Sequence, residues 1–133
     1  MNDGKHIINV LIVTVLLSIS MLVVTNESKV PHKAVHVWTK ADSKAYARDQ
    51  LNNWAHKQYV CLASMWGKES AWKHTAINHE EVMGKFAGGI PQLLGMSPTT
   101  PPTIQIDRGL DYIYNRYGTP CQAWKFHQKN GWY

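Results

Sequence analysis

The sequence predicts a mainly α-helical protein, with one small domain that follows an apolar N-terminal segment. Three observations predict this class. Apolar residues recur at helical spacing in several stretches of residues 45–133. Caps, prolines and glycines mark helix ends at 100–101, 118–120 and 130–131. The alternation typical of strands is negligible outside a polar loop at 73–89, where a brief hairpin is expected.

Residues 1–26 are expected to be a membrane anchor or signal segment. Residues 7–24 carry no charge and reach the lower length limit of a membrane-spanning helix. No Ala-x-Ala cleavage site follows them, which favours an uncleaved signal anchor that contacts the membrane. A cleaved export signal is the alternative. Both interpretations predict that the folded part lies outside the cytoplasm, in the periplasm or at the cell surface.

A polar linker is expected at 27–44, followed by the domain at 45–133. Asp42 or Ser43 is expected to cap the first helix. The apolar stripe of that helix is predicted from four residues: Ala45, Leu51, Trp54 and Ala55. A domain of this size has a marginal core, which a covalent link often supports.

The net charge and the spacing of the histidines limit the kinds of partner and metal site that are expected for this chain. The net charge of +5 and six tryptophans suit an anionic or sugar-rich partner, although a solvated charged surface explains the balance almost as well. No basic run or nucleic-acid motif is present, so nucleic acid is not an expected partner. His32 and His36 lack a third ligand nearby, and the zinc-protease pattern begun by His79 fails because position 83 is Met. Neither a metal nor another cofactor is expected.

The stretch 61–72 (CLASMWGKESAW) holds the main candidate for chemistry. In a helix over residues 61–70, four residues share one face: Leu62, Met65, Trp66 and Glu69. A carboxyl group against Trp and Met loses hydration in its charged form, so the pKa of Glu69 is expected to rise towards neutrality. Such a group can act as a general acid. A rim glutamate paired with Lys68 or Lys73 is the competing interpretation.

Cys61 and Cys121 are expected to form a disulfide, because an exported domain meets oxidising conditions. A bridge over this separation is worth roughly 3–4 kcal/mol on the chain-entropy model. It would also steady the helix that carries Glu69. Two free buried thiols are the alternative.

The remaining elements follow from turn and cap chemistry. The turn at 87–92 (AGGIPQ) presents Gln92 after two glycines and a proline, an arrangement that suits hydrogen bonding to a sugar but is also ordinary turn chemistry. Thr100 and Pro101 are expected to start a helix that ends at Gly118. Its predicted buried face comprises Ile104, Leu110, Ile113, Tyr114 and Tyr117. A last helix is expected from Thr119-Pro120 to Asn130-Gly131, carrying Cys121, Trp124 and His127.

The order of these motifs resembles the soluble lytic transglycosylase family. The shared features are Glu-Ser on a buried helical face, Gly-Ile-Pro-Gln, a tyrosine-rich helix, Cys-Gln-Ala-Trp and a final Gly-Trp-Tyr. Small exported bacterial and phage members are the most similar, over roughly residues 45–133. The resemblance implies a lysozyme-like fold and cleavage of the β-1,4 bond between N-acetylmuramic acid and N-acetylglucosamine in peptidoglycan. A monomer is expected.

The resemblance also implies roles for individual residues. Glu69 matches the catalytic acid/base, next to Ser70. Gln92 matches a substrate-binding glutamine whose usual motif is Gly-Leu-Met-Gln, here Gly89, Ile90, Pro91 and Gln92. Tyr112 and Trp124 are further expected substrate contacts, although Trp124 stands where the family often has Tyr.

A lytic transglycosylase needs one carboxylate, and the resemblance implies that Glu69 supplies it. Two alternatives stay open. If Glu81 or Asp107 faces the cleft, a bound water would make the protein a hydrolytic muramidase of goose-lysozyme type; Glu80 and Asp111 are expected to be solvated. A membrane-anchored wall-binding module without turnover is the other alternative. The sequence does not separate a bacterial wall-remodelling role from a phage entry or lysis role.

Overall fold

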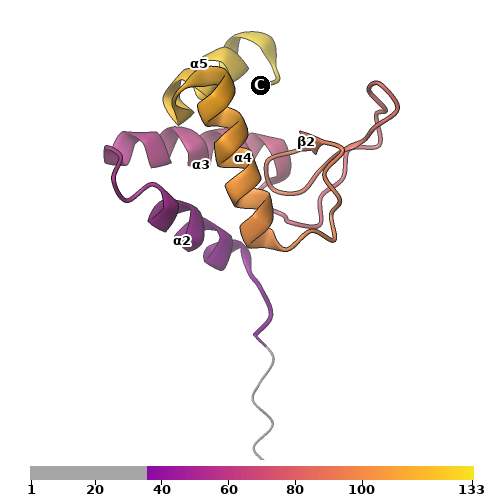
Figure 1. Ribbon diagram of the computed structural model, residues 1–133, viewed down its shortest axis with the longest axis horizontal. Helices are drawn as coiled ribbons and strands as arrows, with labels where there is room; N and C mark the ends of the chain where they lie inside the picture. The colour runs from indigo at the N-terminus through magenta and orange to yellow at the C-terminus, as the bar shows by residue number, and fades with distance from the viewer. Residues whose placement is uncertain (1–35) are drawn as a thin grey trace, which may run out of the picture. The chain divides into compact units, whose positions relative to one another are not determined.

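Four helices and one small sheet make up residues 36–133, the part of the chain that the computed structural model describes (Figure 1). The helices are α2 (Lys40–Gln50), α3 (His56–Ser70), α4 (Pro102–Tyr117) and α5 (Pro120–Asn130). They contain 54% of these residues, which confirms the mainly α prediction. Strand β1 (Ala87–Gly88) pairs antiparallel with β2 (Leu93–Leu94), with Ala87 opposite Leu94.

The predicted membrane segment at 7–24 lies outside the described residues, as does 27–35 of the predicted linker. No helix between 36 and 133 is long and apolar enough to cross a bilayer. The folded unit already begins at His36, because Trp38 Nε1 donates a hydrogen bond to the buried Ser43 Oγ at 2.8 Å. The last residues of the expected linker are therefore part of the domain.

Helix α2 begins at Lys40, earlier than the sequence indicated, because Thr39 is its cap. The Thr39 hydroxyl accepts a hydrogen bond from the Asp42 N–H at 3.2 Å, while the Asp42 carboxylate accepts one from the Thr39 N–H at 2.7 Å. This reciprocal capping box places Asp42 in the first turn rather than at the cap. The helix buries Ser43 and Ala47 and ends at Gln50. The predicted stripe was therefore wrong: Ala45 and Ala55 are exposed, and Leu51 and Trp54, which do pack in the core, lie beyond the helix end.

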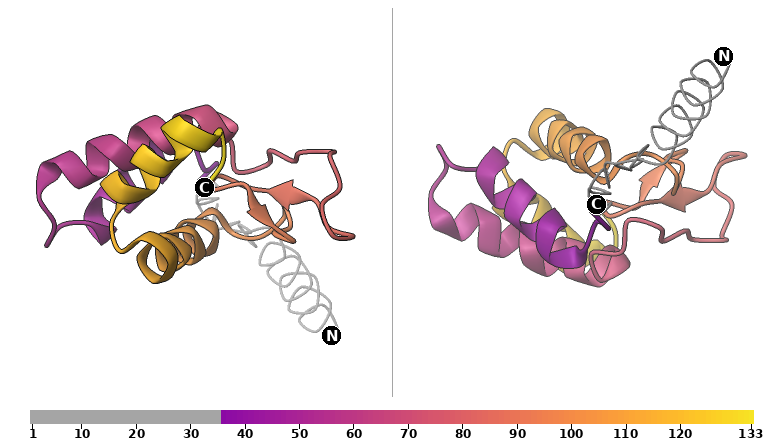
Figure 2. Two further views of the ribbon diagram at one scale, coloured as in Figure 1. Left: turned by 90° about the horizontal axis from the view of Figure 1, so that it is seen from above. Right: turned by 90° about the horizontal axis from the view of Figure 1, so that it is seen from below.

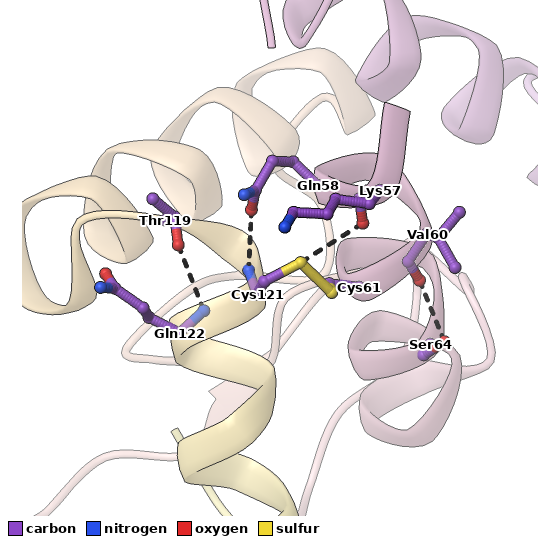
Figure 3. Close-up of a disulfide and its surroundings, with 8 residues drawn as sticks. All are labelled: Lys57, Gln58, Val60, Cys61, Ser64, Thr119, Cys121 and Gln122. Atoms are coloured by element: carbon purple, nitrogen blue, oxygen red, sulfur yellow. Dashed lines mark hydrogen bonds between the residues drawn. A yellow bond between two sulfur atoms is a disulfide. The ribbon is translucent and has the colours of Figure 1, made fainter. Parts of the chain in front are cut away.

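Helix α3 runs along α5, and both views in Figure 2 show the two side by side. The predicted apolar face is confirmed: Leu62, Met65 and Trp66 are fully buried. The predicted disulfide is confirmed as well, since Cys61 of α3 is bonded to Cys121 of α5 (Figure 3). Beside it, the Cys121 N–H donates to Gln58 Oε1 at 3.0 Å, which gives the start of α5 a second tie to α3.

The predicted inward face of α4 is confirmed only in part, since Leu110, Ile113 and Tyr117 lie in or against the core. Ile106, Gly109 and Ile113 are buried, whereas Ile104 is 40% exposed and Tyr114 is 65% exposed. The cause is a close approach at Gly109, where an added Cβ would lie 2.7 Å from Trp66 Cζ2 and 2.8 Å from Pro91 Cβ. The cap is Pro101 rather than Thr100, while the predicted ends at Gly118, Thr119 and Gly131 are confirmed.

The segment between α3 and α4 is mostly irregular and projects from one end of the helices (Figure 2). Bridges between Ile77 and Gly88 and between Val82 and Lys85 form the expected brief hairpin. The chain then returns through the turn at 89–92 to β2. That turn lies against α4, which brings Gln92 towards the end of α3.

Gly109→Ala is expected to destabilise the domain, because the added methyl group overlaps Trp66 and Pro91. Overpacking of this kind costs about 1–3 kcal/mol in the free energy of unfolding, measured by urea denaturation. Gly67→Ala is the matched control, since a Cβ there meets nothing within 4 Å. In the helix interior that control should stabilise by up to about 1 kcal/mol. Equal effects of the two changes would contradict the close packing at Gly109.

Reduction of the Cys61–Cys121 bond is expected to lower the free energy of unfolding by roughly 3–4 kcal/mol, because the unfolded chain regains the freedom of a long loop. Denaturation of the oxidised protein and of the double Cys→Ala variant measures this difference. Adding reductant to the variant controls for effects elsewhere and should change nothing. A double variant as stable as the oxidised protein would show that the bond does not support the fold.

Candidate functional site

Glu69 lies in the last turn of α3, at the wall of the largest described cleft. The cleft has a volume of about 760 Å³. Its walls come from the end of α3, the hairpin, Gln92 and the C-terminal segment: Gly67, Lys68, Glu69, Ser70, Ala71, Ala76, Ile77, Asn78, Glu80, Ala87, Gln92, Gly131, Trp132 and Tyr133. Such a cleft suits a ligand that meets one acid and several hydrogen-bonding groups.

The Glu69 carboxylate is paired with His127 of α5, and not with Lys68 or Lys73. His127 Nε2 lies 2.9 Å from Glu69 Oε1, and the side chains are 13% and 17% exposed, respectively. Burial raises the pKa of Glu69 above its ordinary value, and the charge and hydrogen bond of His127 oppose this rise. The expected direction of the shift is therefore confirmed. A carboxyl group in this state can donate a proton and later accept one.

The turn at 89–92 is closed by the pairing of β1 with β2, and side chains fasten it to the helices. Ser70 Oγ donates to the Ile90 carbonyl at 2.7 Å, so Ser70 fastens the turn to the helix that carries Glu69. Ile90 is fully buried, and Gly89 has a positive φ of 73°. Gln92 Nε2 donates to the Gly89 carbonyl at 2.8 Å, which fixes the amide at the cleft wall.

Gln105 is the buried centre of the contacts that support this turn, and sequence reasoning missed it. Its Oε1 accepts the Ile90 N–H at 2.8 Å, and its Nε2 donates to the carbonyls of His74 and Thr100 at 2.9 and 2.8 Å. The side chain is fully buried with both amide atoms in use. The available signal was its position directly before Ile106, on the inward face of α4. It was missed because the expected buried face contained Ile104 and not Ile106.

Tyr133 connects the C-terminal segment to both parts of the site. Its hydroxyl donates to the Pro91 carbonyl at 2.7 Å and accepts from Trp66 Nε1 at 2.8 Å. Burial raises the pKa of this phenol well above its ordinary value, and the hydrogen bond from Trp66 opposes the rise. The phenol therefore stays neutral and serves as a hydrogen-bonding link.

A second, more apolar groove of about 650 Å³ adjoins the cleft, because both are lined by Gln92, Trp132 and Tyr133. The predicted contact residue Tyr112 lines this groove beside Arg116, and its hydroxyl donates to the Tyr133 carbonyl at 3.3 Å. Hairpin and β2 residues form the opposite wall: Val82, Met83, Leu93 and Leu94. The cleft and the groove together extend well beyond Glu69.

Trp124, the other predicted contact, is not among the residues that line the cleft. Its ring stacks on His127 with centroids 5.3 Å apart and an interplanar angle of 28°. Trp124 therefore orients the partner of Glu69. His127 is on the inward face of α5, one turn beyond Trp124, but no feature of the sequence indicated that it meets Glu69.

Among the other described carboxylates, only Glu80 lines the cleft. Glu81 and Asp107, the two expected candidates for holding a water, do not line it. Asp107 instead accepts a hydrogen bond from the Tyr46 hydroxyl at 3.1 Å. Asp111 borders a separate small pocket between α2 and α4. In residues 36–133, no group of three or more His, Cys, Asp or Glu side chains is placed to hold a metal ion.

Comparison of the chain with protein-family models, with curated proteins and with solved structures found no match.

Tyr133→Phe is expected to destabilise the domain, because the Pro91 carbonyl and Trp66 Nε1 both lose their buried partner. A buried polar group left without a hydrogen bond costs about 1–3 kcal/mol, measurable by urea denaturation. Tyr114→Phe removes the same hydroxyl from an exposed position on α4 and should change stability by less than about 0.5 kcal/mol. Equal stability of the two variants would mean that Tyr133 does not hold the turn.

Proposed function

We propose that this domain is a lytic transglycosylase that cleaves the β-1,4 bond between N-acetylmuramic acid and N-acetylglucosamine in peptidoglycan. The observation that carries the proposal is Glu69, a largely buried carboxyl with a raised pKa at the wall of a large cleft. Such a residue is suited to general acid and then general base chemistry. The order of motifs that resembles the transglycosylase family gives the substrate class.

The reaction requires two proton transfers by the same side chain. Protonated Glu69 gives its proton to the glycosidic oxygen, and the bond from that oxygen to the muramic C1 breaks. The muramic 6-hydroxyl then attacks C1, and its proton passes to the Glu69 carboxylate. The product is a 1,6-anhydromuramic end, no water is consumed, and Glu69 returns to its protonated form. No second carboxylate takes part.

The adjoining groove supports a polymeric substrate. Gln92 stands where the cleft meets the groove and offers an amide to a sugar hydroxyl or N-acetyl group. Trp132 and Tyr112 add aromatic rings that suit packing against sugar faces. In this proposal Gly89, Ile90 and Ser70 hold Gln92 in place through backbone contacts. The expected membrane anchor would hold the domain near the cell wall, outside the cytoplasm.

A hydrolytic muramidase is the second candidate, and Glu80 is the observation that favours it. This residue lines the same cleft and could hold an attacking water on the side opposite the acid. Its side chain belongs to an exposed part of the hairpin and is not buried as that of Glu69 is. Glu80 replaces Glu81 and Asp107 as the carboxylate to test.

A Glu69→Gln variant is expected to lose product formation by at least about 100-fold, the usual contribution of general acid–base catalysis. The measurement is mass spectrometry of soluble products after the oxidised full chain, kept in detergent, digests purified peptidoglycan. The wild-type protein should release 1,6-anhydromuramic ends, whereas Glu80→Gln should retain most of that activity.

Each other outcome points to a different function. Reducing muramic ends, heavier by one water, together with loss of activity in Glu80→Gln, would establish the hydrolase. Product formation that survives Glu69→Gln would overturn the proposed role of Glu69. A folded, oxidised protein that binds peptidoglycan but releases no product would establish the non-catalytic wall-binding module.

A further inference from the structure

The contact between Glu69 and His127 is more constrained than an ordinary surface ion pair. Both side chains are largely buried, and no other side chain in residues 36–133 hydrogen-bonds to the carboxylate. The imidazole is fixed on one face by stacking on Trp124 and meets the Tyr133 ring at a centroid distance of 6.4 Å. The helices that carry the pair are joined by the Cys61–Cys121 bond. Packing thus holds His127 in one orientation towards Glu69.

We propose that His127 is a positioning residue for Glu69, and that its charge sets the pH range in which Glu69 holds a proton. The proposal rests on the proposed transglycosylase function. His127 holds Oε1 at 2.9 Å, whereas Oε2 has no hydrogen bond within the described part of the chain. Oε2 is therefore the oxygen left free to exchange a proton with the substrate.

The two groups share one proton in the state that can react. That state has two forms, carboxylate with imidazolium and carboxylic acid with imidazole, and only the second can protonate the glycosidic oxygen. Burial favours the neutral form, and the positive charge of His127 favours the ionised one. After the first transfer the imidazole is neutral, and its Nε2–H, 2.9 Å from Oε1, still donates to the Glu69 carboxylate until the 6-hydroxyl returns a proton. Groups that interact this closely titrate as a pair.

Other charged and titratable groups surround the pair at longer range. Lys68 and Glu80 line the cleft from α3 and from the hairpin, and the Tyr133 phenol approaches from the C-terminal segment. Lys125 and Lys129 are exposed on α5, and Tyr112 of α4 lies behind Tyr133. Among these described residues, none forms an ion pair with Glu69 or His127. His127 is therefore the dominant charge acting on Glu69.

Two substitutions of His127 distinguish its role in positioning Glu69 from the effect of its charge. His127→Gln keeps an N–H donor but cannot become charged, whereas His127→Phe keeps a ring to stack on Trp124 but has neither donor nor charge. Carbon NMR of the Glu69 carboxyl should show its titration midpoint at higher pH in both variants than in the wild-type chain. At the pH optimum of each, His127→Phe should form anhydro product roughly 10-fold more slowly than His127→Gln, the effect of one charge-assisted hydrogen bond. His56→Gln, at the exposed start of α3, is the control and should change neither quantity.

An unchanged Glu69 midpoint in both variants would overturn the role of the charge, and equal rates of the two variants would overturn the role in positioning. Should the variants not fold, the wild-type chain alone decides: the carbon resonance of the Glu69 carboxyl should move in two steps with pH, and a single step would refute the pair. A wild-type chain that titrates as a pair but forms no product would reject the proposed function and not the pairing.

Discussion

The fully buried indole of Trp66 is the contact on which the site depends. Its Nε1 donates to Tyr133, its ring edge fills the space left by Gly109 on α4, and Trp72 packs against it with centroids 5.4 Å apart. Trp66 lies one helical turn before Ser70, which fastens the 89–92 turn. One side chain thereby sets the spacing of α3, α4 and the C-terminal segment. The cleft opens where the end of α3 and the C-terminal segment face the hairpin and Gln92.

The burial that raises the pKa of Glu69 also carries a cost. A carboxyl withdrawn from water is unfavourable in its charged form, and an unpaired one would lower the stability of the domain. His127 offsets this cost without removing the shift, because desolvation is the larger influence on the pKa of Glu69. Trp124 and Tyr133 provide the packing that keeps the imidazole in place. A few side chains therefore limit the loss of stability caused by burying Glu69 and still leave its pKa raised.

Local signals in the sequence predicted most of the helices, the apolar face of α3 and the disulfide. The helices and the apolar face follow from spacing and caps, which depend on nearby residues: the predicted ends at Gly118 and Gly131 are examples. The disulfide followed from the expected export of a chain with two cysteines. The start of α2 was misplaced because Thr39 competes with Asp42 as a cap, and only the reciprocal hydrogen bonds decide between them. The face of α4 was partly wrong because a glycine, which carries no apolar signal, determines where this helix approaches Trp66.

Glu69 was predicted from the sequence as the candidate acid of the site. The residues that contact Glu69 or support the neighbouring turn were not predicted. Glu69 could be found because its apolar neighbours lie on the same helix, within two turns of sequence. His127 and Gln105 act on residues far away in the chain, and a single polar residue on a helix gives no sign of which distant partner it will meet. Trp124 illustrates the difference: its place on α5 was evident, yet it stacks on His127 and is not part of the cleft wall. The chemistry of this site thus depends on contacts between helices, which local patterns do not encode.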